Sequence, residues 1–328
     1  MAWLRSVPIP FPYRCPFPIA FRGVNLLTSR RHCAPVESSA LIFIATRRFD
    51  RLGLRLRAWL LKRSKAGVTG LRTRLTSSEV PIGDGVQEGD WRTIASFPAL
   101  SPREVQVWRK RVAGGPLDVW EQELPAAERA RCRTYVQLAD RERFAGGRCF
   151  LRRLLAAHLG EATLIVLGYG ENGKPNLRDF PHLHFNMSHS GDWIVVAISE
   201  SPIGVDVEQL RPFPDMDAVA SSCFGAGELR SFHAASGVNR VRSFFRNWIH
   251  KEAYLKMRGC GLIDGLTEID LEYAVSTSSI IRTEGERRER LAALEFEVAE
   301  GYLGSVVADR SAPDFLLFEV SPSRFHNH

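Results

Sequence analysis

The sequence predicts an α+β fold. Two long stretches, 140–160 and 241–258, place apolar residues near helical spacing, and short strand-like runs lie before, between and after them. These strands and helices do not alternate regularly, as they would in a doubly wound parallel sheet. A chain of 328 residues with 45% hydrophobic and 25% charged residues is also typical of an ordinary soluble protein with a full core. We therefore expect one large domain or two smaller ones.

The charge is distributed unevenly along the chain. Residues 1–90 carry 15 Lys/Arg and six Asp/Glu, whereas residues 91–328 carry 29 and 31. The overall charge of +7 therefore belongs to the N-terminal part and says little about the partners of the remainder. An Arg-rich, acid-poor start is typical of an organelle transit peptide or of a basic nucleic-acid arm. We interpret residues 1–94 as a basic, disordered extension, and the other two interpretations stay open.

Cysteine usage and hydropathy limit the class of protein further. The six cysteines form no CxxC pair and no Cys/His cluster with zinc spacing, so neither a disulfide scaffold nor a zinc site is expected. No run of 18 apolar residues occurs, so we expect no membrane span. A reducing, cytoplasmic location is the expectation.

The secondary-structure elements follow one another from about Pro98. The pattern predicts a short strand at 105–108, a helix at 124–135 that Pro125 opens, the basic-faced helix at 140–160, a strand at 163–169 and a turn with the sequence ENGKPN. It then predicts helices between 217 and 236, the helix at 241–258 with Gly259 as its terminator, and short strands up to FLLFEV at 315–320.

The stretch at 185–208, FNMSHSGDWIVVAISESPIGVDVE, is the first place to look for chemistry. A polar FNMSHS turn leads into the apolar strand at 193–199, and a second strand then carries Asp206 and Glu208. Strand side chains alternate between faces, so these two carboxylates share one. Two adjacent acids repel unless a cation lies between them or one holds a proton. An edge strand whose polar face meets solvent explains an isolated pair equally well.

Glu252 makes a metal site the better interpretation. It follows Phe245 and Trp248 at positions i+7 and i+4, which places it on the aromatic, inward-facing stripe of its helix. The alternative is an i,i+4 ion pair with Lys256 on a solvated face. Because its stripe is aromatic, we favour a buried acid. Three converging carboxylates would suit Mg²⁺, which commonly bridges substrate phosphates.

Polar and basic residues for a phosphate lie in the same part of the chain. A hydroxyl, an imidazole and several cations are candidates, although each cation alone is as readily a solvated surface charge: Lys174, Ser188, His189, Lys251, Lys256, Arg143 and Arg152.

Four ordered blocks resemble a known family. GKP at 173–175, FNMSHS at 185–190, IGVDVE at 203–208 and WIHKEAYLK at 248–256 are similar to the signature blocks of the 4′-phosphopantetheinyl transferases of the surfactin-synthetase-activating type. EVQVWR at 104–109, ERARC at 128–132 and DRERF at 140–144 fit the first half of that family. The resemblance covers roughly residues 95 to 328.

The resemblance implies a fold and an activity. The fold would be a pseudo-dimer of two similar α+β halves, here 95–200 and 201–328, with the active site in the cleft between them. Such enzymes transfer the phosphopantetheine arm of coenzyme A to a serine of an apo acyl or peptidyl carrier protein and release 3′,5′-ADP. Magnesium is required, and the carriers serve fatty-acid, polyketide or nonribosomal-peptide synthesis. A monomer is expected, with no nucleic-acid partner.

The resemblance also implies residue roles. Asp206, Glu208 and Glu252 correspond to the magnesium ligands, and Glu252 would be the base for the carrier serine, with Asp206 and Lys256 also catalytic. The coenzyme A ligands would be Lys251 and Lys256 at the pyrophosphate, Lys174, Ser188 and His189 at the adenosine and its 3′-phosphate, and Arg143 and Arg131 near that phosphate.

The sequence departs from the family pattern at two places, and one alternative function stays open. Glu128 stands where a relative carries a basic residue, so the grip on the 3′-phosphate would be weaker or would move to Arg131. Ile249 and His250 receive no role. The rival is a binding protein that keeps the fold without turnover, against which the three mutually repelling acids argue.

Overall fold

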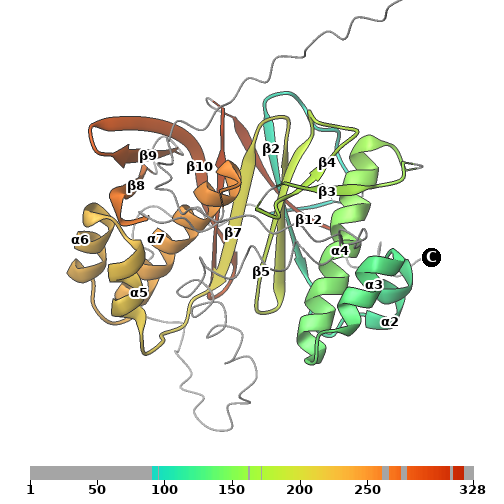
Figure 1. Ribbon diagram of the computed structural model, residues 1–328, viewed down its shortest axis with the longest axis horizontal. Coiled ribbons are helices and arrows are strands. Elements are labelled where there is room, and N and C mark those ends of the chain that lie inside the picture. Colours follow the sequence, from blue (N-terminus) through green and yellow to red (C-terminus); the bar gives the residue numbers. More distant parts are fainter. Residues whose placement is uncertain are drawn as a thin grey trace, which may run out of the picture. The chain divides into compact units, whose positions relative to one another are not determined.

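The computed structural model describes residues 91–320 except 95, 162, 171, 261–265, 275–278 and 311–312. All described residues fall within one compact unit of the chain. The interpretations of residues 1–90 as an extension, a transit peptide or a nucleic-acid arm lie outside the described residues. Two five-stranded sheets with helices on their outer faces, and a small two-stranded sheet, make up the fold (Figure 1).

The first half contains one long helix and most of the first sheet. Its elements are β1 (Arg92–Ile94), β2 (Glu104–Arg111), α2 (Leu117–Glu123), α3 (Ala126–Arg133), α4 (Leu138–Leu159), β3 (Leu167–Tyr169), β4 (Pro175–Leu177), β5 (His184–Ser190) and β6 (Trp193–Ser199). An apolar cluster between α4 and the sheet includes Phe150, Leu154 and Ile194, each buried. The helix at 140–160 is thereby confirmed, whereas α2 is an addition that the apolar pattern did not indicate.

The second half repeats this plan. Its elements are β7 (Ile203–Gln209), α5 (Met216–Cys223), α6 (Ala226–Ala234), α7 (Gly237–Arg258), the short 3-10 helix η3 (Leu266–Glu268), β8 (Ile269–Ala274), β9 (Ser279–Glu284), β10 (Arg287–Ala299), β11 (Tyr302–Ala308) and β12 (Asp314–Val320). Gly259 ends α7 in a left-handed conformation with φ of 69°, as predicted.

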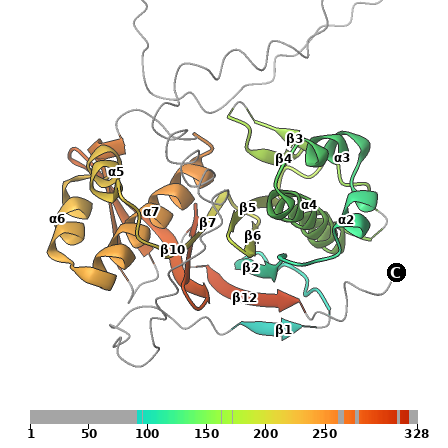
Figure 2. The same cartoon turned by 90° about the horizontal axis from the view of Figure 1, so that it is seen from below.

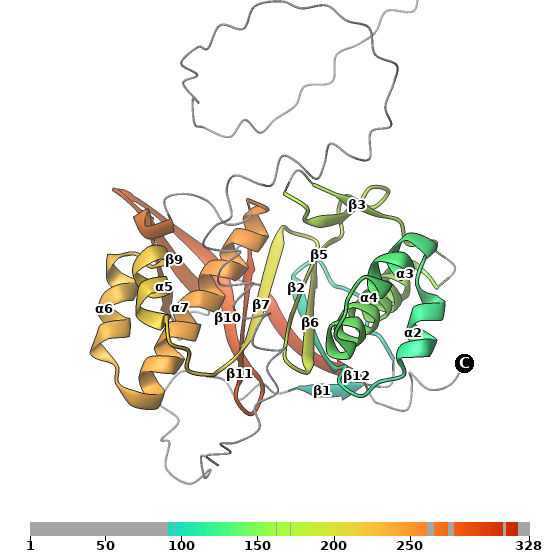
Figure 3. The same cartoon turned by 60° about the horizontal axis from the view of Figure 1, so that its bottom comes forward.

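The predicted α+β pseudo-dimer is confirmed. Each half packs a 22-residue helix, α4 or α7, on the outer face of a five-stranded sheet (Figure 3). The inner faces of the two sheets meet in a third apolar cluster to which β2, β6, β7 and β10 contribute Val107, Val195, Val205 and Phe296. The part of the chain that the structure describes therefore has four layers, helix, sheet, sheet and helix, with the two sheets at the centre.

The chain passes from the first half to the second near residue 200, between β6 and β7, but one strand of the second half returns to the first sheet. The strand order of the first sheet is β1-β12-β2-β6-β5, so the C-terminal strand lies in the first half between β1 and β2 (Figure 2). Phe318 of β12 stacks on Trp108 of β2 with ring centroids 4.7 Å apart, and both rings are buried. Residues 92–94, expected in the extension, form β1 alongside β12. Burial of apolar side chains explains why β12 joins the first sheet, because this strand completes the core of the first half.

The FNMSHS segment is a strand rather than the expected turn. It forms β5, which pairs antiparallel with β6 over seven residues, and the turn between them is Gly191–Asp192. Gly191 adopts φ of 52°, which a glycine tolerates without strain. No helix among the described residues is both long and apolar enough to cross a membrane.

Candidate active site at the junction of the two sheets

The edge strands β5 and β7 join the two sheets through side chains. The polar residues of β5 alternate, so every second one faces β7. Asn186 accepts a hydrogen bond from the backbone N–H of Val205 at 2.9 Å, and Ser190 accepts one from that of Gln209 at 3.1 Å. The FNMSHS segment thus aligns β7, and with it the two acids that β7 carries.

Asp206 is a buried carboxylate with an incomplete set of partners. Its side chain is 3% exposed, and its Oδ1 accepts hydrogen bonds from Ser188 Oγ at 2.8 Å and from Lys256 Nζ at 2.5 Å. The Lys256 ammonium also donates to Ser188 Oγ at 3.0 Å. Asp206 Oδ2 is buried and accepts no hydrogen bond. A buried, unsatisfied anionic oxygen is costly, so this atom fits a cation ligand.

Glu208 lies two residues further along β7, on the same face. Ser190 Oγ donates a hydrogen bond to its Oε2 at 2.8 Å. Burial raises the pKa of Glu208 to about 8, and the negative charges of Asp206 and Glu252 add to this effect against the opposing Ser190 and Lys256. Burial and neighbouring carboxylates therefore both disfavour the ionised form of Glu208.

Glu252 approaches these acids from α7. Its side chain is 7% exposed, and Phe245 and Trp248 on the same stripe are 2% and 6% exposed, so the predicted burial is confirmed. Gly204 lets the helix lie directly on β7, because a Cβ there would stand 2.0 Å from the carbonyl oxygen of Ala253. The three acids therefore lie near enough for the charges of Asp206 and Glu252 to act on Glu208.

The donor set suits a hard divalent cation, since three carboxylates supply only oxygen ligands. Among the described residues, no three His, Cys, Asp or Glu side chains already stand in the spacing of a metal site. The Lys256 ammonium lies instead against Asp206. Magnesium at Asp206, Glu208 and Glu252 thus stays a prediction, which the orphaned Asp206 oxygen favours.

Ser188 and His189 take different positions although they were predicted together. Ser188 faces β7 and binds Asp206, whereas His189 is the next residue of the strand and its side chain is exposed. Protein atoms around the ring, and next the charges of Arg143 and Lys256, lower the pKa of His189 to about 4. Arg143 also binds the carbonyl oxygen of Gly191, two residues beyond His189, so its guanidinium lies close to this end of β5.

The other first-half candidates lie on two helices, Arg143 in the second turn of α4 and Arg131 near the end of α3. Arg143 donates a hydrogen bond to the carbonyl oxygen of Gly191 at 3.2 Å and pairs with Asp140. Arg131 is exposed, with its guanidinium 5.5 Å from the ring centre of Phe144. The Arg131 guanidinium can therefore meet an anion at the surface, whereas the Arg143 side chain is only 16% exposed and already pairs with Asp140.

Glu128 and Arg152 are engaged with each other. Arg152 donates to Glu128 Oε2 at 3.0 Å and to the carbonyl oxygen of Ile165 at 2.6 Å, and Arg148 stands 3.9 Å from the same carboxylate. Glu128 therefore neutralises part of the basic face of α4, which removes Arg152 from the set of phosphate candidates.

Lys174 connects the two halves. Its ammonium donates to the carbonyl oxygens of Ile203 at 2.9 Å and Met257 at 3.1 Å, and burial lowers its pKa to about 8. In this arrangement Lys174 ties the β3–β4 turn to the start of β7 and the end of α7. Its expected contact with the nucleotide stays a prediction.

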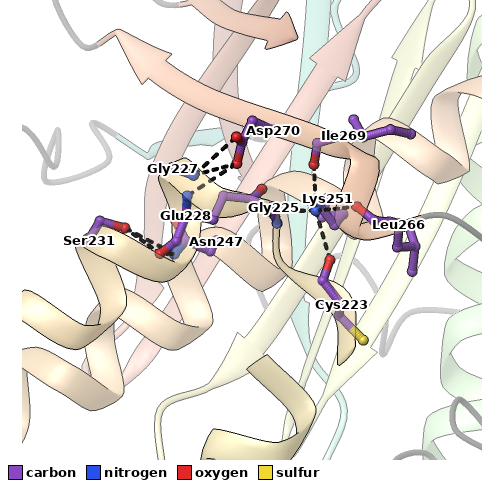
Figure 4. A network of polar contacts seen from close by, with 10 residues as sticks. All are labelled: Cys223, Gly225, Gly227, Glu228, Ser231, Asn247, Lys251, Leu266, Ile269 and Asp270. Atoms are coloured by element: carbon purple, nitrogen blue, oxygen red, sulfur yellow. Dashed lines mark hydrogen bonds and ion pairs between the residues drawn. The ribbon is translucent and has the colours of Figure 1, made fainter. Parts of the chain in front are cut away.

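Lys251 does not join the acid cluster, contrary to the expectation of a pyrophosphate contact. Its ammonium is 2% exposed and donates to Glu228 Oε2 at 2.6 Å and to three carbonyl oxygens, those of Cys223, Leu266 and Ile269, at 2.8 to 3.0 Å (Figure 4). Residues five apart on a helix point about 140° apart, so Lys251 and Lys256 face different neighbours. Lys251 anchors α5, α6 and β8 to α7 instead.

Comparisons with known proteins agree with this geometry. Residues 202–307 match the model of the 4′-phosphopantetheinyl transferase superfamily, and residues 117–201 match that of the 4′-phosphopantetheinyl transferase N-terminal domain. The chain is 33% identical over 192 residues to the 4′-phosphopantetheinyl transferase HetI of Nostoc sp., which covers 55% of this chain and 78% of HetI. The chain belongs to the 4′-phosphopantetheinyl transferase superfamily. The family that the ordered blocks indicated is thereby confirmed.

Two Bacillus relatives match a shorter part. The 4′-phosphopantetheinyl transferase psf-1 of Bacillus pumilus is 31% identical over 156 residues, 47% of this chain and 66% of psf-1. A 4′-phosphopantetheinyl transferase of Bacillus subtilis is 34% identical over 138 residues, 42% of this chain and 61% of the relative. The chain thus spans somewhat less than two thirds of the length of these two relatives.

The two family models meet where the two sheets meet. The boundary between residues 201 and 202 lies in the connection from β6 to β7. The three acids and Lys256 fall in the superfamily match, whereas Arg131, Arg143, Lys174, Ser188 and His189 fall in the N-terminal match. Each match therefore contributes a different side of the candidate site.

Sequence reasoning missed three residues that shape the site. Asn186 and Ser190 align β7, and their two-residue spacing would have indicated this role had the segment been interpreted as a strand. His250, which received no role, is 2% exposed and binds Glu295 and Ser305. Nothing in the local sequence indicates that contact, because both partners lie more than 40 residues away.

Proposed function

We propose that this protein transfers the 4′-phosphopantetheine group of coenzyme A to a serine hydroxyl of an apo acyl or peptidyl carrier protein. The serine oxygen forms a bond to phosphorus, the bond from that phosphorus to the bridging oxygen breaks, and 3′,5′-ADP leaves. The observation that carries the proposal is the mutual influence of three acids of β7 and α7, Asp206, Glu208 and Glu252, in a chain whose two halves each match this family. The names of HetI and psf-1 as 4′-phosphopantetheinyl transferases support it.

Attack on a phosphorus that bears anionic oxygens needs charge neutralisation and alignment more than covalent help. Lys256 supplies a fixed positive charge, since its ammonium is held by Asp206 and Ser188 at the junction. Glu252 would accept the proton of the serine hydroxyl, directly or through a water molecule. Asp206, Glu208 and Glu252 would hold Mg²⁺, which when bound would neutralise the pyrophosphate.

The first half would bind the nucleotide end of coenzyme A. Exposed His189 lies on β5, Arg143 of α4 binds the carbonyl oxygen of Gly191 just beyond it, and exposed Arg131 lies on α3. Guanidinium groups suit a phosphate because they donate paired hydrogen bonds. The location of the acids on the other side of the junction would then place the pyrophosphate between the halves.

The test is labelling of a panel of apo carrier proteins from fatty-acid, polyketide and nonribosomal-peptide synthesis with coenzyme A that carries a fluorescent group. We expect one class of carrier to become fluorescent, with release of 3′,5′-ADP in equal amount. Asp206→Ala should abolish labelling, because it removes a metal ligand and the partner of Lys256. Asp314→Ala, which changes an exposed acid at the start of β12, is the matched control and should label at the wild-type rate. Absence of labelling on every carrier by folded protein would contradict the proposal.

A further inference from the structure

A row of three polar residues crosses the second sheet beneath α7. Glu295 of β10 is the register partner of Ser305 of β11, and Ser305 is the register partner of Asp206 of β7. Register partners in antiparallel strands place their side chains on the same face of the sheet. All three are buried, with exposed fractions of 0%, 0% and 3%. A continuous polar row inside an apolar core requires hydrogen-bond partners along its length.

Helix α7 supplies those partners. Arg246 donates two hydrogen bonds to Glu295 at 2.8 and 2.7 Å. His250 bridges the first two members of the row, with Nε2 at 3.0 Å from Glu295 Oε2 and Nδ1 at 2.8 Å from Ser305 Oγ. Lys256 binds the third member, Asp206. The helix that carries Glu252 is therefore hydrogen-bonded to every position of the row.

The His250 ring is held in one orientation. It is 2% exposed and stacks on Tyr273, with ring centroids 4.7 Å apart at 22°, and the Tyr273 hydroxyl accepts a hydrogen bond from the backbone N–H of Glu295. Rotation of the ring would break the bonds to Glu295 and Ser305 together. Both bonds are possible for a neutral or a charged imidazole, because Ser305 Oγ can donate or accept.

The contact at Gly204 has a different role. It allows α7 to lie directly on β7 and so sets the distance between the helix and the strand. The His250 ring forms hydrogen bonds to two adjacent strands, and hydrogen bonds are directional. They therefore fix both the rotation of α7 about its axis and its position along that axis. Glu252 lies two residues beyond His250, so its position depends directly on the rotation and axial position of α7.

We propose that His250 is a positioning residue for the acid cluster: through Glu295 and Ser305 it holds α7 where Glu252 and Lys256 reach Asp206. This inference rests on the proposed function in one respect: it takes Asp206, Glu208 and Glu252 to be the metal-binding active site. His250 itself touches none of the three acids through any contact described for it.

The first experiment measures Mn²⁺ binding by the full chain without coenzyme A or carrier, by electron paramagnetic resonance. His250→Leu should weaken Mn²⁺ binding about tenfold, as loss of a group that orients metal ligands commonly does. Ser305→Ala, which removes one hydrogen bond and little volume, should weaken it less but in the same direction. His250→Gln should recover part of the affinity, because its amide can still donate to Glu295.

The second experiment measures kcat and KM with a carrier that the wild type modifies. His250→Leu should lower kcat about 100-fold, the cost expected when a catalytic group moves by about 1 Å.

The matched control is His158→Leu. His158 is half-buried and also bonded through both ring nitrogens, with Nε2 2.9 Å from Gln106 Oε1 and Nδ1 2.8 Å from the carbonyl oxygen of Leu154, but it lies on α4 in the first half. This variant should lose thermal stability comparably and keep wild-type Mn²⁺ binding and kcat.

The outcomes separate the two proposals. A wild type that binds Mn²⁺ but modifies no carrier would contradict the proposed function and leave the positioning role to be decided by the Mn²⁺ titrations. Wild-type Mn²⁺ binding in both His250→Leu and Ser305→Ala would overturn the positioning role. Equal losses of Mn²⁺ affinity and kcat in His158→Leu would also overturn the positioning role, since the losses in His250→Leu would then be explained by lower stability alone. If His250→Leu does not fold, Ser305→Ala and His250→Gln decide the question.

Discussion

Glu295 combines complete burial with an ionised carboxylate. Burial alone would raise its pKa, but hydrogen bonds from His250 and Arg246 outweigh burial and lower the pKa to about 2. The carboxylate is therefore charged in the folded protein over the whole neutral range. Its stabilisation depends on two partners from one helix.

This pKa predicts how stability responds to acid. The unfolded chain takes up the proton near the ordinary pKa of 4.5 and the folded chain only near about 2, so acid favours the unfolded state between these values. The contribution is complete above about pH 5 and amounts to roughly 3 kcal/mol, which is lost as the pH falls to about 2. Glu295→Gln should show a shallower acid slope of the unfolding free energy in urea titrations. Exposed Glu300→Gln should keep the wild-type slope, and an unchanged slope in Glu295→Gln would contradict the assignment.

At the scale of elements, the Lys251–Glu228 pair joins α6 to α7. Both side chains are almost fully buried, and burial raises the pKa of Glu228 to about 7 against the opposing effect of Lys251. Glu228 also accepts a hydrogen bond from the backbone N–H of Gly225 at the start of α6. Loss of one partner would leave the other buried without its counter-charge.

Lys251→Met should therefore lower the unfolding free energy by about 3 to 5 kcal/mol, the usual cost of breaking a buried pair. Lys251→Met combined with Glu228→Gln should recover much of this loss in chemical denaturation, because no charge is then left unpaired. The double variant should keep its KM for coenzyme A within about twofold of the wild type. If the double variant is stable but its KM for coenzyme A is raised about tenfold or more, the original expectation that Lys251 contacts the pyrophosphate would be correct.

The contact between α7 and β7 depends on Gly204. A Cβ at this position would stand 2.0 Å from the carbonyl oxygen of Ala253 and 2.3 Å from the backbone nitrogen of Met257. Gly204→Ala should cost about 3 kcal/mol or more in thermal or chemical unfolding, since backbone atoms cannot move aside cheaply. Exposed Gly170→Ala, whose nearest neighbour would lie 3.7 Å away, should change stability by less than about 0.5 kcal/mol. Similar stabilities for both variants would show that α7 has room to shift.

At the scale of the whole molecule, the chain folds its last strand into its first half. β12 pairs in parallel with β1 and with β2, so the first sheet is incomplete without residues 314–320. Residues 95–200 produced alone should therefore lack a cooperative unfolding transition and give a poorly dispersed amide NMR spectrum. Addition of the 201–328 fragment should restore dispersion, because it supplies β12. A well-dispersed spectrum of the first fragment alone would contradict this account.

The parts of the structure that could be predicted from sequence are those with a local signal. The apolar spacing around Glu252 predicted its burial, and the two-residue spacing of Asp206 and Glu208 predicted their shared face. The FNMSHS segment was interpreted as a turn because its polar residues hid the alternation that directs Asn186 and Ser190 to β7. Long-range pairings carry no local signal, which is why the place of β12 was missed.

Lysine roles show the same division between local and distant information. Lys251 and Lys256 have similar surroundings in the sequence, and both were expected at a pyrophosphate. Only the fold distinguishes them, since Lys256 meets Asp206 whereas Lys251 meets Glu228 and carbonyl groups from distant elements. A helix position shows which residues share a face, but not what that face contacts.

The central claim is that the acids of β7 and α7 form a metal-dependent transferase site. The most direct test is the intact mass of an apo carrier protein after incubation with coenzyme A and this protein, with Mg²⁺ or with a chelator. We predict an increase by one phosphopantetheine group with the wild type and Mg²⁺ only, and no increase with Asp206→Ala. An unchanged carrier mass with the wild type, or an equal increase with Asp206→Ala, would contradict the claim.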